Sequence, residues 1–308
     1  MKVFVSGAAG VIGRQLVIQL LDKGYEVTGG DTKPRPNEFP DSVTYVEGDL
    51  NELNQKQWDL ISPSIFFHLA ATFQRTSESV EYWPDWFENN IQLSHHLITL
   101  ARNGKGLSRV VFASSYLIYN SDKYMLGGNQ SPLVLSENET TDPRNLIGLA
   151  KLLHERELDF LQATGNVAFT SVSARIFRGF GLGSRDVISR WIRALLADEK
   201  IEVYDDQGSF DFTYCKDAAS GLLALGTSTN YSGVVNVSSG VSTKIKDVVL
   251  MLLEIFPEGK VVSRGSRDTV ERSNGNLSLI ESLTGWKPAY SLSSALKEIA
   301  EYESTRLE

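Results

Sequence analysis

The chain has 308 residues, of which 42% are hydrophobic and 22% charged, and its formal net charge is −8. This composition excludes an intrinsically disordered chain, and the acidic balance argues against nucleic acid as a partner. The single cysteine, Cys215, excludes an internal disulfide and a cysteine-cluster metal site, so we expect no metal and a reducing compartment, the cytoplasm.

The apolar segments of the chain are short. The N-terminal stretch MKVFVSGAAG runs directly into a predicted strand, so we expect no signal peptide. The longest apolar runs, such as SIFFHLAATF at 64–73, are too short to cross a bilayer. We therefore expect a soluble protein with no membrane partner.

Short β-branched runs alternate with helical patterns in the first half of the chain. Strands are predicted at 2–7, 25–31, 43–49, 64–71, 109–115 and 167–177. Helices are predicted at 11–24, 86–104 and, with Asp142 and Pro143 in its first turn, 140–161. Continuous apolar strands separated by helices predict an α/β fold with a doubly wound parallel sheet, covered on both faces.

After about Ile176 the pattern changes to helices joined by shorter strands. Helices are predicted at 190–198, 216–226, 244–256, 277–285 and 292–304. We expect residues 1–176 to form the larger domain and residues 177–308 a smaller C-terminal α/β lobe. No clean linker separates the two, so the chain is free to cross between them.

The junction between the first strand and the first helix carries three glycines, Gly7, Gly10 and Gly13. Glycines at this point permit a tight turn and bring backbone N–H groups close to a pyrophosphate. Asp31 ends the second strand, where a carboxylate accepts hydrogen bonds from an adenosine ribose and repels a 2′-phosphate. We expect a dinucleotide, NAD rather than NADP, although Lys33 and Arg35 can pair with a phosphate.

Several further motifs follow in a fixed order. They are EGDL at 47–50, FHLAA at 67–71, NIQLSHHLITLA at 90–101, RVVFASSYLIYN at 109–120 and LTGWKPAYSL at 283–292. Together with GAAGVIG at 7–13 they resemble the extended short-chain dehydrogenases/reductases, specifically the nucleotide-sugar epimerase/dehydratase group. The resemblance covers nearly the whole chain. It implies a Rossmann-type NAD-binding domain followed by a substrate-binding lobe.

The resemblance also implies which residues contact NAD. The implied set is Gly7, Gly10, Ile12, Gly13, Asp31, Asp49, Leu50, Ala70, Ala71, Asn90 and Lys151. Asp49 and Leu50 would flank the adenine, and Ala70 and Ala71 would line the cleft. His68 lies on an apolar strand, and we interpret it as a core histidine rather than a metal ligand or a base.

In this family a serine positions the reacting oxygen, a tyrosine exchanges its proton, and a lysine holds the nicotinamide ribose and lowers the pKa of the tyrosine. Ser115 and Lys151 match the serine and lysine positions, so the resemblance implies that both are catalytic. The tyrosine position is Ile147, which has no proton to give. Loss of a general acid typically reduces the rate about 10²–10⁴-fold.

Three explanations for Ile147 stay open. Another group supplies the proton: three tyrosines follow Ser115, namely Tyr116, Tyr119 and Tyr124, and Lys151 can act directly if it is desolvated. Of the tyrosines we choose Tyr124, which lies in a segment whose glycines predict a mobile loop. Alternatively a substrate group or water serves, or the protein binds NAD without turnover.

The substrate side departs from the family as well. Arg178 replaces an asparagine that follows the strand at 167–177, and Phe210 replaces an arginine that binds pyrophosphate. Arginines in this half of the chain can still bind phosphate through paired N–H groups. The residues expected to bind substrate are Arg178, Phe210 and Arg267.

We expect an NAD-dependent epimerase, dehydratase or reductase that acts on a nucleotide-linked sugar through a keto intermediate, with a non-standard proton donor. Tyr116 and Leu117 follow Ser115 where a dehydratase would carry an acid, which disfavours a dehydratase. The alternatives are a non-catalytic NAD(H)-binding sensor or partner protein, and a reductase of a non-nucleotide carbonyl compound. The family commonly pairs the helices matching 86–103 and 145–162 between protomers, so we expect a homodimer.

Overall fold

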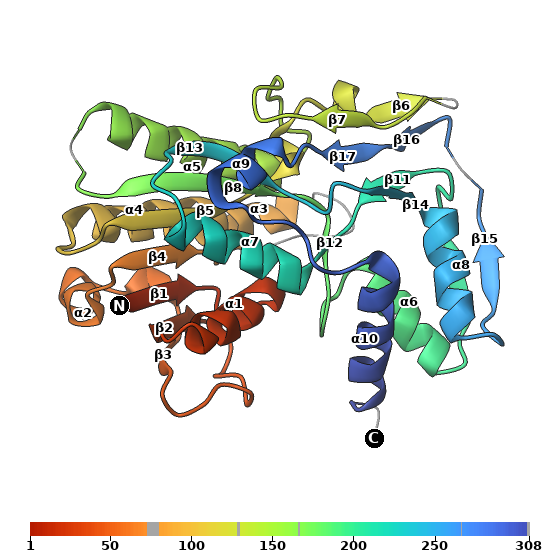
Figure 1. The fold of residues 1–308 in the computed structure, drawn as a ribbon, viewed down its shortest axis with the longest axis horizontal. Coiled ribbons are helices and arrows are strands. Elements are labelled where there is room, and N and C mark those ends of the chain that lie inside the picture. Colours follow the sequence, from red (N-terminus) through yellow and green to blue (C-terminus); the bar gives the residue numbers. More distant parts are fainter. Residues whose placement is uncertain (73–79, 128–129, 166, 266, 307–308) are drawn as a thin grey trace.

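The computed structural model describes residues 1–308 apart from 73–79, 128–129, 166, 266 and 307–308. A seven-stranded sheet of order β13-β8-β5-β4-β1-β2-β3 forms its larger part, and all neighbouring strands pair in parallel (Figure 1). The strands are β1 (Lys2–Ser6), β2 (Glu26–Asp31), β3 (Thr44–Glu47), β4 (Ile65–His68), β5 (Arg109–Ser115), β8 (Thr170–Ile176) and β13 (Gly233–Val237). The predicted doubly wound α/β fold is confirmed.

Side chains alternate between the two faces of this sheet, and each face has its own core. Val3 and Val5 pack on one face, whereas Phe4 packs on the other. The first face is covered by α1 (Val11–Asp22), α7 (Cys215–Thr227) and α9 (Ser278–Thr284). The second is covered by α2 (Gln55–Ile61), α4 (Leu93–Asn103) and α5 (Leu146–Ala163). Both faces are therefore closed to water, as continuous apolar strands require.

The smaller part of the molecule has a hydrophobic core of its own, which we call the second core. It lies beside the carboxyl ends of the strands, on the right of Figure 1. Its helices are α6 (Val187–Leu196), α8 (Ile245–Ile255) and α10 (Leu292–Ser304). Short strands pair in twos around it: β10 (Ile201–Val203) with β15 (Val261–Ser263), β11 (Ser209–Asp211) with β14 (Ser242–Lys244), and β12 (Thr213–Tyr214) with β9 (Gly179–Phe180). Two more pairs, β6 (Met125–Gly127) with β16 (Thr269–Glu271) and β7 (Leu133–Leu135) with β17 (Ser273–Gly275), join it to the first half of the chain.

The chain crosses between the two parts more than once. After α6 it returns to the large sheet as α7 and β13, and α9 packs on the same face as α7. In the other direction, β6 and β7 leave the first half to pair with β16 and β17. Each of the two parts therefore contains segments from both sides of residue 176.

The predicted helix over 86–104 is interrupted. A short helix α3 (Trp83–Trp86) leads into a π-helical turn, η3 (Phe87–Gln92), before α4 begins. Inside this turn the carbonyl of Asn90 accepts a hydrogen bond from Nε2 of His154 on α5, at 3.0 Å. A π-helical turn of this kind is frequent beside functional sites.

The helix α5 begins six residues later than predicted, at Leu146. Asn145 caps it, because its side chain accepts a 2.8 Å hydrogen bond from the Gly148 N–H. Pro143 stays outside the helix. A side chain at Gly148 would lie 2.5 Å from the carbonyl oxygen of Leu117, so the glycine lets α5 approach the turn that follows β5.

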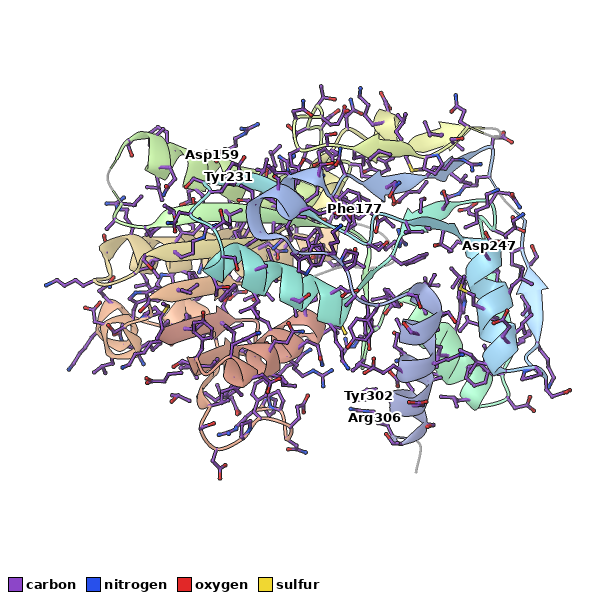
Figure 2. All side chains as sticks on the ribbon, viewed as in Figure 1. Asp159, Phe177, Tyr231, Asp247, Tyr302 and Arg306 are labelled. Carbon is purple, nitrogen blue, oxygen red and sulfur yellow. The ribbon has the colours of Figure 1, made fainter. Side chains whose placement is uncertain are left out.

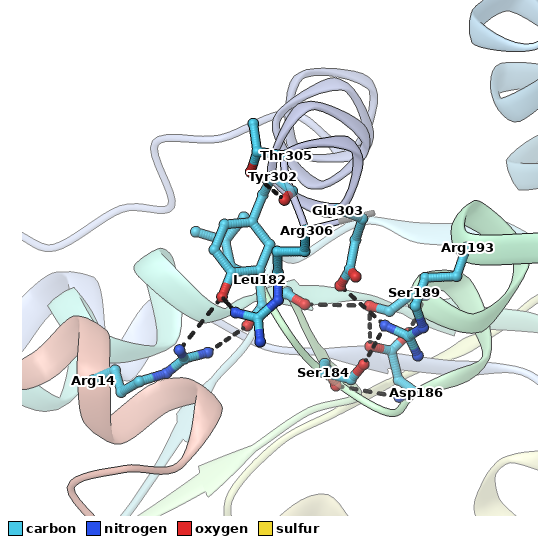
Figure 3. A network of polar contacts seen from close by, with 11 residues as sticks. Arg14, Leu182, Ser184, Asp186, Ser189, Arg193, Tyr302, Glu303, Thr305 and Arg306 are labelled. Atoms are coloured by element: carbon cyan, nitrogen blue, oxygen red, sulfur yellow. Dashed lines mark hydrogen bonds and ion pairs between the residues drawn. The ribbon is translucent and has the colours of Figure 1, made fainter. Parts of the chain in front are cut away.

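The junction between the two parts is held by polar contacts (Figure 3). Arg14 on α1 donates to the Leu182 carbonyl at 3.0 Å and approaches the Tyr302 hydroxyl of α10 at 3.5 Å. Arg193 on α6 donates one hydrogen bond to the Ser184 carbonyl and one to the Glu303 carboxylate of α10, each at 2.9 Å. The loop that contains Leu182 and Ser184 is thus fixed between α1, α6 and α10.

Candidate active site

The three glycines after β1 build the turn that the sequence predicts. Gly7 has a φ of 74°, and a side chain on it would lie 2.7 Å from the Ala70 backbone nitrogen. A side chain on Gly13 would lie 2.1 Å from the Gly7 carbonyl oxygen. Helix α1 begins with Gly10 as its N-cap and has no side-chain cap, so its first N–H groups are left for another acceptor.

One cavity of about 440 Å³ opens at this turn, along the carboxyl ends of the strands. Among the predicted cofactor residues it is lined by Gly7, Gly10, Asp31, Asp49, Leu50, Ala70 and Ala71. The sequence did not indicate Val11, Thr72, Asp85 or Gly183, which line it too, and Arg185 closes it from the second core. We call this cavity the cofactor cleft.

Four other predicted cofactor residues do not line the cofactor cleft: Ile12, Gly13, Asn90 and Lys151, of which Lys151 is described below. Gly13 supports the turn, and Ile12 packs against both cores. The Asn90 side chain accepts a hydrogen bond from the backbone N–H of Thr72 at 3.0 Å, so it shapes the wall of the cofactor cleft. Its amide nitrogen is buried without a hydrogen-bond partner in the described residues.

Asp31 is fixed at the end of β2. One carboxylate oxygen accepts from the Ala9 N–H and the other from the Lys33 N–H, each at 3.0 Å. Lys33 also lines the cofactor cleft. The fixed Asp31 carboxylate can accept hydrogen bonds from the adenosine ribose of a dinucleotide. The uncapped N-terminus of α1 and the space beside the glycines suit its pyrophosphate. The residues present therefore fit such a cofactor.

The two serines at the end of β5 differ in their surroundings. Ser114 is buried and donates to a Glu155 carboxylate oxygen at 2.5 Å. Ser115 is half-buried, and among the described residues its hydroxyl accepts a hydrogen bond from the Leu117 N–H alone, at 3.2 Å. Ser115 keeps its own proton available, as its predicted role requires.

Lys151 lies on the buried side of α5, with 9% of its surface exposed. Its ammonium nitrogen lies 4.7 Å from the centre of the Phe112 ring. Burial lowers the pKa of Lys151 to about 8, with Glu155 opposing the change. No ion pair to Lys151 occurs within the part of the chain that the structure describes.

Ile147 lies one turn before Lys151 and is buried in an aromatic cluster with Tyr116, Tyr119 and Tyr124. The Tyr116 hydroxyl donates to Glu271 at 2.7 Å, and the Tyr119 hydroxyl donates to Asn236 at 2.6 Å. Burial is the largest cause of a raised pKa in each of these phenols.

The prediction that Tyr124 lies in a mobile loop is wrong. A 3₁₀ turn, Ser121–Lys123, precedes it, and β6 follows it directly. The ring is fully buried in the aromatic cluster, with the centre of the Tyr116 ring 5.9 Å away. Burial raises the pKa of Tyr124 to about 12, and its hydroxyl has no hydrogen-bond partner among the described residues.

The predicted substrate residues separate into two places. The Arg178 guanidinium lies 4.2 Å above the Phe210 ring, so the structure brings these two together. Arg267 instead forms an ion pair with Asp205 on the surface of the second core, with 77% of its side chain exposed. Glu271, which pairs with Arg178 at 3.5 Å, was missed because one glutamate in a polar stretch carries no distinctive pattern.

His68 has the role expected of a core histidine. It is fully buried between the hydroxyls of Ser6, at 2.7 Å, and Ser94, at 2.9 Å. Burial, followed by the charges of Lys151 and His154, lowers the pKa of His68 well below its usual value. Within the described residues, no three side chains of the metal-ligating types form a metal site.

Comparison with known proteins decides the family. Residues 3–238 match the model of the NAD dependent epimerase/dehydratase family. The chain belongs to this family. A curated relative from Bacillus subtilis, described as an uncharacterized UDP-glucose epimerase, YtcB, is 26% identical and covers 99% of this chain and 98% of its own. UDP-glucuronate 4-epimerase 5 of Arabidopsis thaliana is 25% identical over 98% of this chain and 75% of its own.

A solved structure described as MoeE5 in complex with UDP-glucuronic acid and NAD superposes with a TM-score of 0.85 at 30% identity, covering 99% of this chain and 100% of that one. The predicted family and the predicted cofactor, NAD, are thereby confirmed, and the chain is related throughout its length to nucleotide-sugar enzymes. No helix in the described ranges is long and apolar enough to cross a membrane.

Proposed function

We propose that the protein is an NAD-dependent epimerase that acts on a UDP-linked sugar through a keto intermediate. The observation that carries this proposal is the arrangement of Ser115 and Lys151, which lie on adjoining elements: Ser115 ends β5, and Lys151 lies in the second turn of α5. The named relatives that act on, or were solved with, UDP-sugars support the uridine nucleotide. Reductase and dehydratase activities stay possible outcomes of the test below.

Each residue has a defined task in this proposal. The chemistry that bound NAD would supply is the reversible uptake of a hydride from a sugar carbon. Ser115 hydrogen-bonds the reacting sugar oxygen and so fixes the carbon beside the cofactor. Lys151 binds the nicotinamide ribose, and Arg178 with Phe210 lines the sugar-nucleotide side.

We assign the proton transfer to Lys151. The hydroxyls of Tyr116 and Tyr119 are held by Glu271 and Asn236, and burial raises the pKa of Tyr124 to about 12. Burial lowers the pKa of Lys151 to about 8 instead, which leaves roughly a tenth of the amine neutral at pH 7 and about half neutral at pH 8. A neutral amine can accept the sugar hydroxyl proton during oxidation and return it during reduction, so Ile147 need not supply one.

The test uses the purified protein loaded with NAD⁺. A panel of UDP-, GDP-, CDP- and dTDP-linked sugars is offered, nicotinamide absorbance is followed, and each sugar is analysed by NMR. We expect one UDP-sugar to be converted to its epimer, at a rate that rises with pH through about 8 as Lys151 loses its proton. Tyr124→Phe should retain this conversion. If Tyr124→Phe abolishes turnover while NAD binding is kept, the proton donor is Tyr124 and the assignment to Lys151 is wrong.

A second candidate is a non-catalytic NAD(H)-binding protein. The apolar surroundings of Ile147 favour it, because the site that would hold the phenol is packed with aromatic rings. This alternative predicts that NAD(H) binds tightly while every sugar in the panel is returned unchanged.

The homodimer remains a proposal with support from the exposed surface. Leu149, Leu153 and Phe160 lie on α5 with 47%, 47% and 68% of their surfaces exposed. Spacings of four and seven residues place these side chains on one side of the helix. A patch of this kind on a helix marks an interaction surface. Sedimentation of the purified protein measures its mass directly, and a monomer at micromolar concentration would contradict the proposal.

A further inference from the structure

Four groups meet at the carboxylate of Glu271, the last residue of β16. One carboxylate oxygen accepts the hydroxyls of Tyr116, at 2.7 Å, and of Ser273, at 3.0 Å. The other oxygen pairs with Arg144 at 2.6 Å and with Arg178 at 3.5 Å. The four partners come from the turn after β5, the segment before α5, the end of β8 and the start of β17. We call this set the Glu271 cluster.

The Glu271 cluster carries excess positive charge. It contains two guanidinium groups and one carboxylate, and Glu271 is the single carboxylate that pairs with either arginine in the described part of the chain. Glu271 is itself buried. Burial alone would raise the pKa of Glu271, but Arg178 and Arg144 outweigh it and lower the pKa, so the carboxylate stays ionised. Within the described residues, one positive charge is therefore left without a carboxylate partner.

The uncompensated charge is open to a ligand. Side-chain exposure is 26% for Arg144 and 38% for Arg178, against 6% for Glu271. A guanidinium has five N–H donors. Arg144 uses two of its nitrogens, one on Glu271 and one on the sulfur of Met125 at 3.1 Å. Arg178 contacts Glu271 through one nitrogen at 3.5 Å and also interacts with the Tyr116 hydroxyl, so both arginines retain donors for an anion.

An aromatic ring lies against each of the two guanidinium groups. Arg178 lies 4.2 Å above the centre of the Phe210 ring, and Arg144 lies 5.0 Å from the centre of the Tyr124 ring. A ring contact of this kind leaves the N–H groups of an arginine free for hydrogen bonds, and arginine recognises a carboxylate through two such donors. The buried Tyr124 hydroxyl, which lacks a partner in the described residues, adds a further unused donor to the Glu271 cluster.

The Glu271 cluster adjoins the reacting end of the sheet. Tyr116 directly follows Ser115, and its ring stacks on Phe177 with centres 5.1 Å apart. Phe177 follows β8 and lies between the large sheet and the second core (Figure 2). Ile147 packs in the same apolar cluster as Tyr116 and Phe177. Neither arginine is among the described residues that line the cofactor cleft, so the anion would belong to the substrate.

We propose that Arg144 and Arg178 bind a carboxylate carried by the sugar, so that the substrate is a nucleotide-linked hexuronic acid. This rests on the proposed function and narrows its substrate class. A sugar nucleotide has a second anionic part, its diphosphate, and either part can satisfy the same guanidinium groups. The Glu271 cluster contains Tyr116, which directly follows Ser115, and this favours the sugar carboxylate over the diphosphate. The experiment below distinguishes these two anions.

The experiment measures binding, so it does not depend on turnover. The NAD-loaded protein is titrated calorimetrically with UDP-glucuronate, UDP-glucose and UDP. A charge-assisted hydrogen-bonded pair corresponds to about a tenfold to hundredfold gain, so UDP-glucuronate should bind at least about tenfold more tightly than UDP-glucose. Equal affinities, or a preference for UDP-glucose, would overturn the inference, and this comparison needs no variant to fold.

Two variants locate the carboxylate. Arg144→Met and Arg178→Met should each lower the affinity for UDP-glucuronate about tenfold while UDP and UDP-glucose keep theirs. Arg190→Met removes an exposed arginine of α6 and should leave all three affinities unaltered. If both variants lower the affinities for all three ligands equally, the arginines bind the diphosphate, and the proposal of a hexuronic acid substrate is wrong. If NAD binds and no sugar nucleotide does, the proposed function itself fails, which is a different result.

Discussion

The ammonium nitrogen of Lys151 lies 4.7 Å from the ring centre of Phe112, while Glu155, one turn further along α5, pairs with Arg175 at 2.8 Å. The carboxylate that could neutralise Lys151 is thus engaged elsewhere. A buried amine with only a ring as its partner is disfavoured in its charged form. Burial of the Lys151 ammonium therefore lowers the stability of the folded protein.

Replacing Lys151 should stabilise the NAD-free protein. A pKa lowered from 10.5 in the unfolded chain to about 8 means that the folded state binds the proton less tightly. The resulting penalty is complete below about pH 8, and it disappears as pH rises from about 8 to 10.5. Lys151→Met should raise the free energy of unfolding near pH 7 by up to about 3 kcal/mol, and by less at higher pH.

Urea unfolding near pH 7 and near pH 9.5 measures this difference. Lys105→Met, at an exposed lysine after α4, should change the free energy of unfolding by no more than about 0.5 kcal/mol at both pH values. A Lys151→Met variant that is less stable than the wild type near pH 7 would show that burial of the amine is not the dominant effect.

Restoring a phenol at Ile147 should create a second route for the proton. Ile147→Tyr introduces extra volume into a packed aromatic cluster, which should destabilise the fold by about 1–3 kcal/mol. Ile147→Phe adds nearly the same volume without the hydroxyl. Turnover of the epimerised sugar by the tyrosine variant should exceed that of the phenylalanine variant at least about tenfold near pH 7. Equal turnover in the two variants would show that a hydroxyl at this position does not reach the reacting oxygen.

Residues that belong to a local pattern could be predicted from the sequence. Strand β5 and helix α10 have the predicted bounds, because apolar spacing and an N-capping serine, Ser291, are local signals. The glycine turn and Asp31 were predictable for the same reason. Their spacing along one β-α-β unit already determines that they meet in space.

The Glu271 cluster could not be predicted, because it depends on distant contacts. Tyr116 and Glu271 are separated by 155 residues and meet only because β16 pairs with β6. The strands concerned are three residues long, too short to show an alternating pattern. The prediction of a mobile loop at Tyr124 failed for the same reason. No local pattern shows that β16 pairs with the strand after Tyr124 and that the Arg272 N–H donates to the Tyr124 carbonyl.

The glycine turn can be tested with a pair of matched substitutions. Gly7 and Gly24 have nearly the same positive φ, 74° and 77°, so alanine introduces similar backbone strain at both. A Cβ at Gly7 would lie 2.7 Å from the Ala70 backbone, whereas a Cβ at Gly24 has nothing within 4 Å. Gly24→Ala should cost about 1–2 kcal/mol of stability and leave NAD affinity unchanged. Gly7→Ala should cost more and abolish NAD binding, measured by calorimetry, and equal NAD affinities in the two variants would contradict this account of the turn.

The buried pair of Glu155 and Arg175 supports the strand that ends at Ser115. Only 2% and 3% of these side chains are exposed, and Glu155 also accepts the Ser114 hydroxyl at 2.5 Å. Glu155→Ala would leave the arginine buried without a counter-charge, so the free energy of unfolding should fall by about 3–5 kcal/mol. The exposed pair of Glu202 and Arg264 is the control: Glu202→Ala should lower the free energy of unfolding far less than Glu155→Ala, because solvent screens a surface pair. Urea unfolding of both variants compares the two, and a similar small loss in each would mean that Arg175 finds other partners, such as the Glu137 carbonyl it already contacts at 2.9 Å.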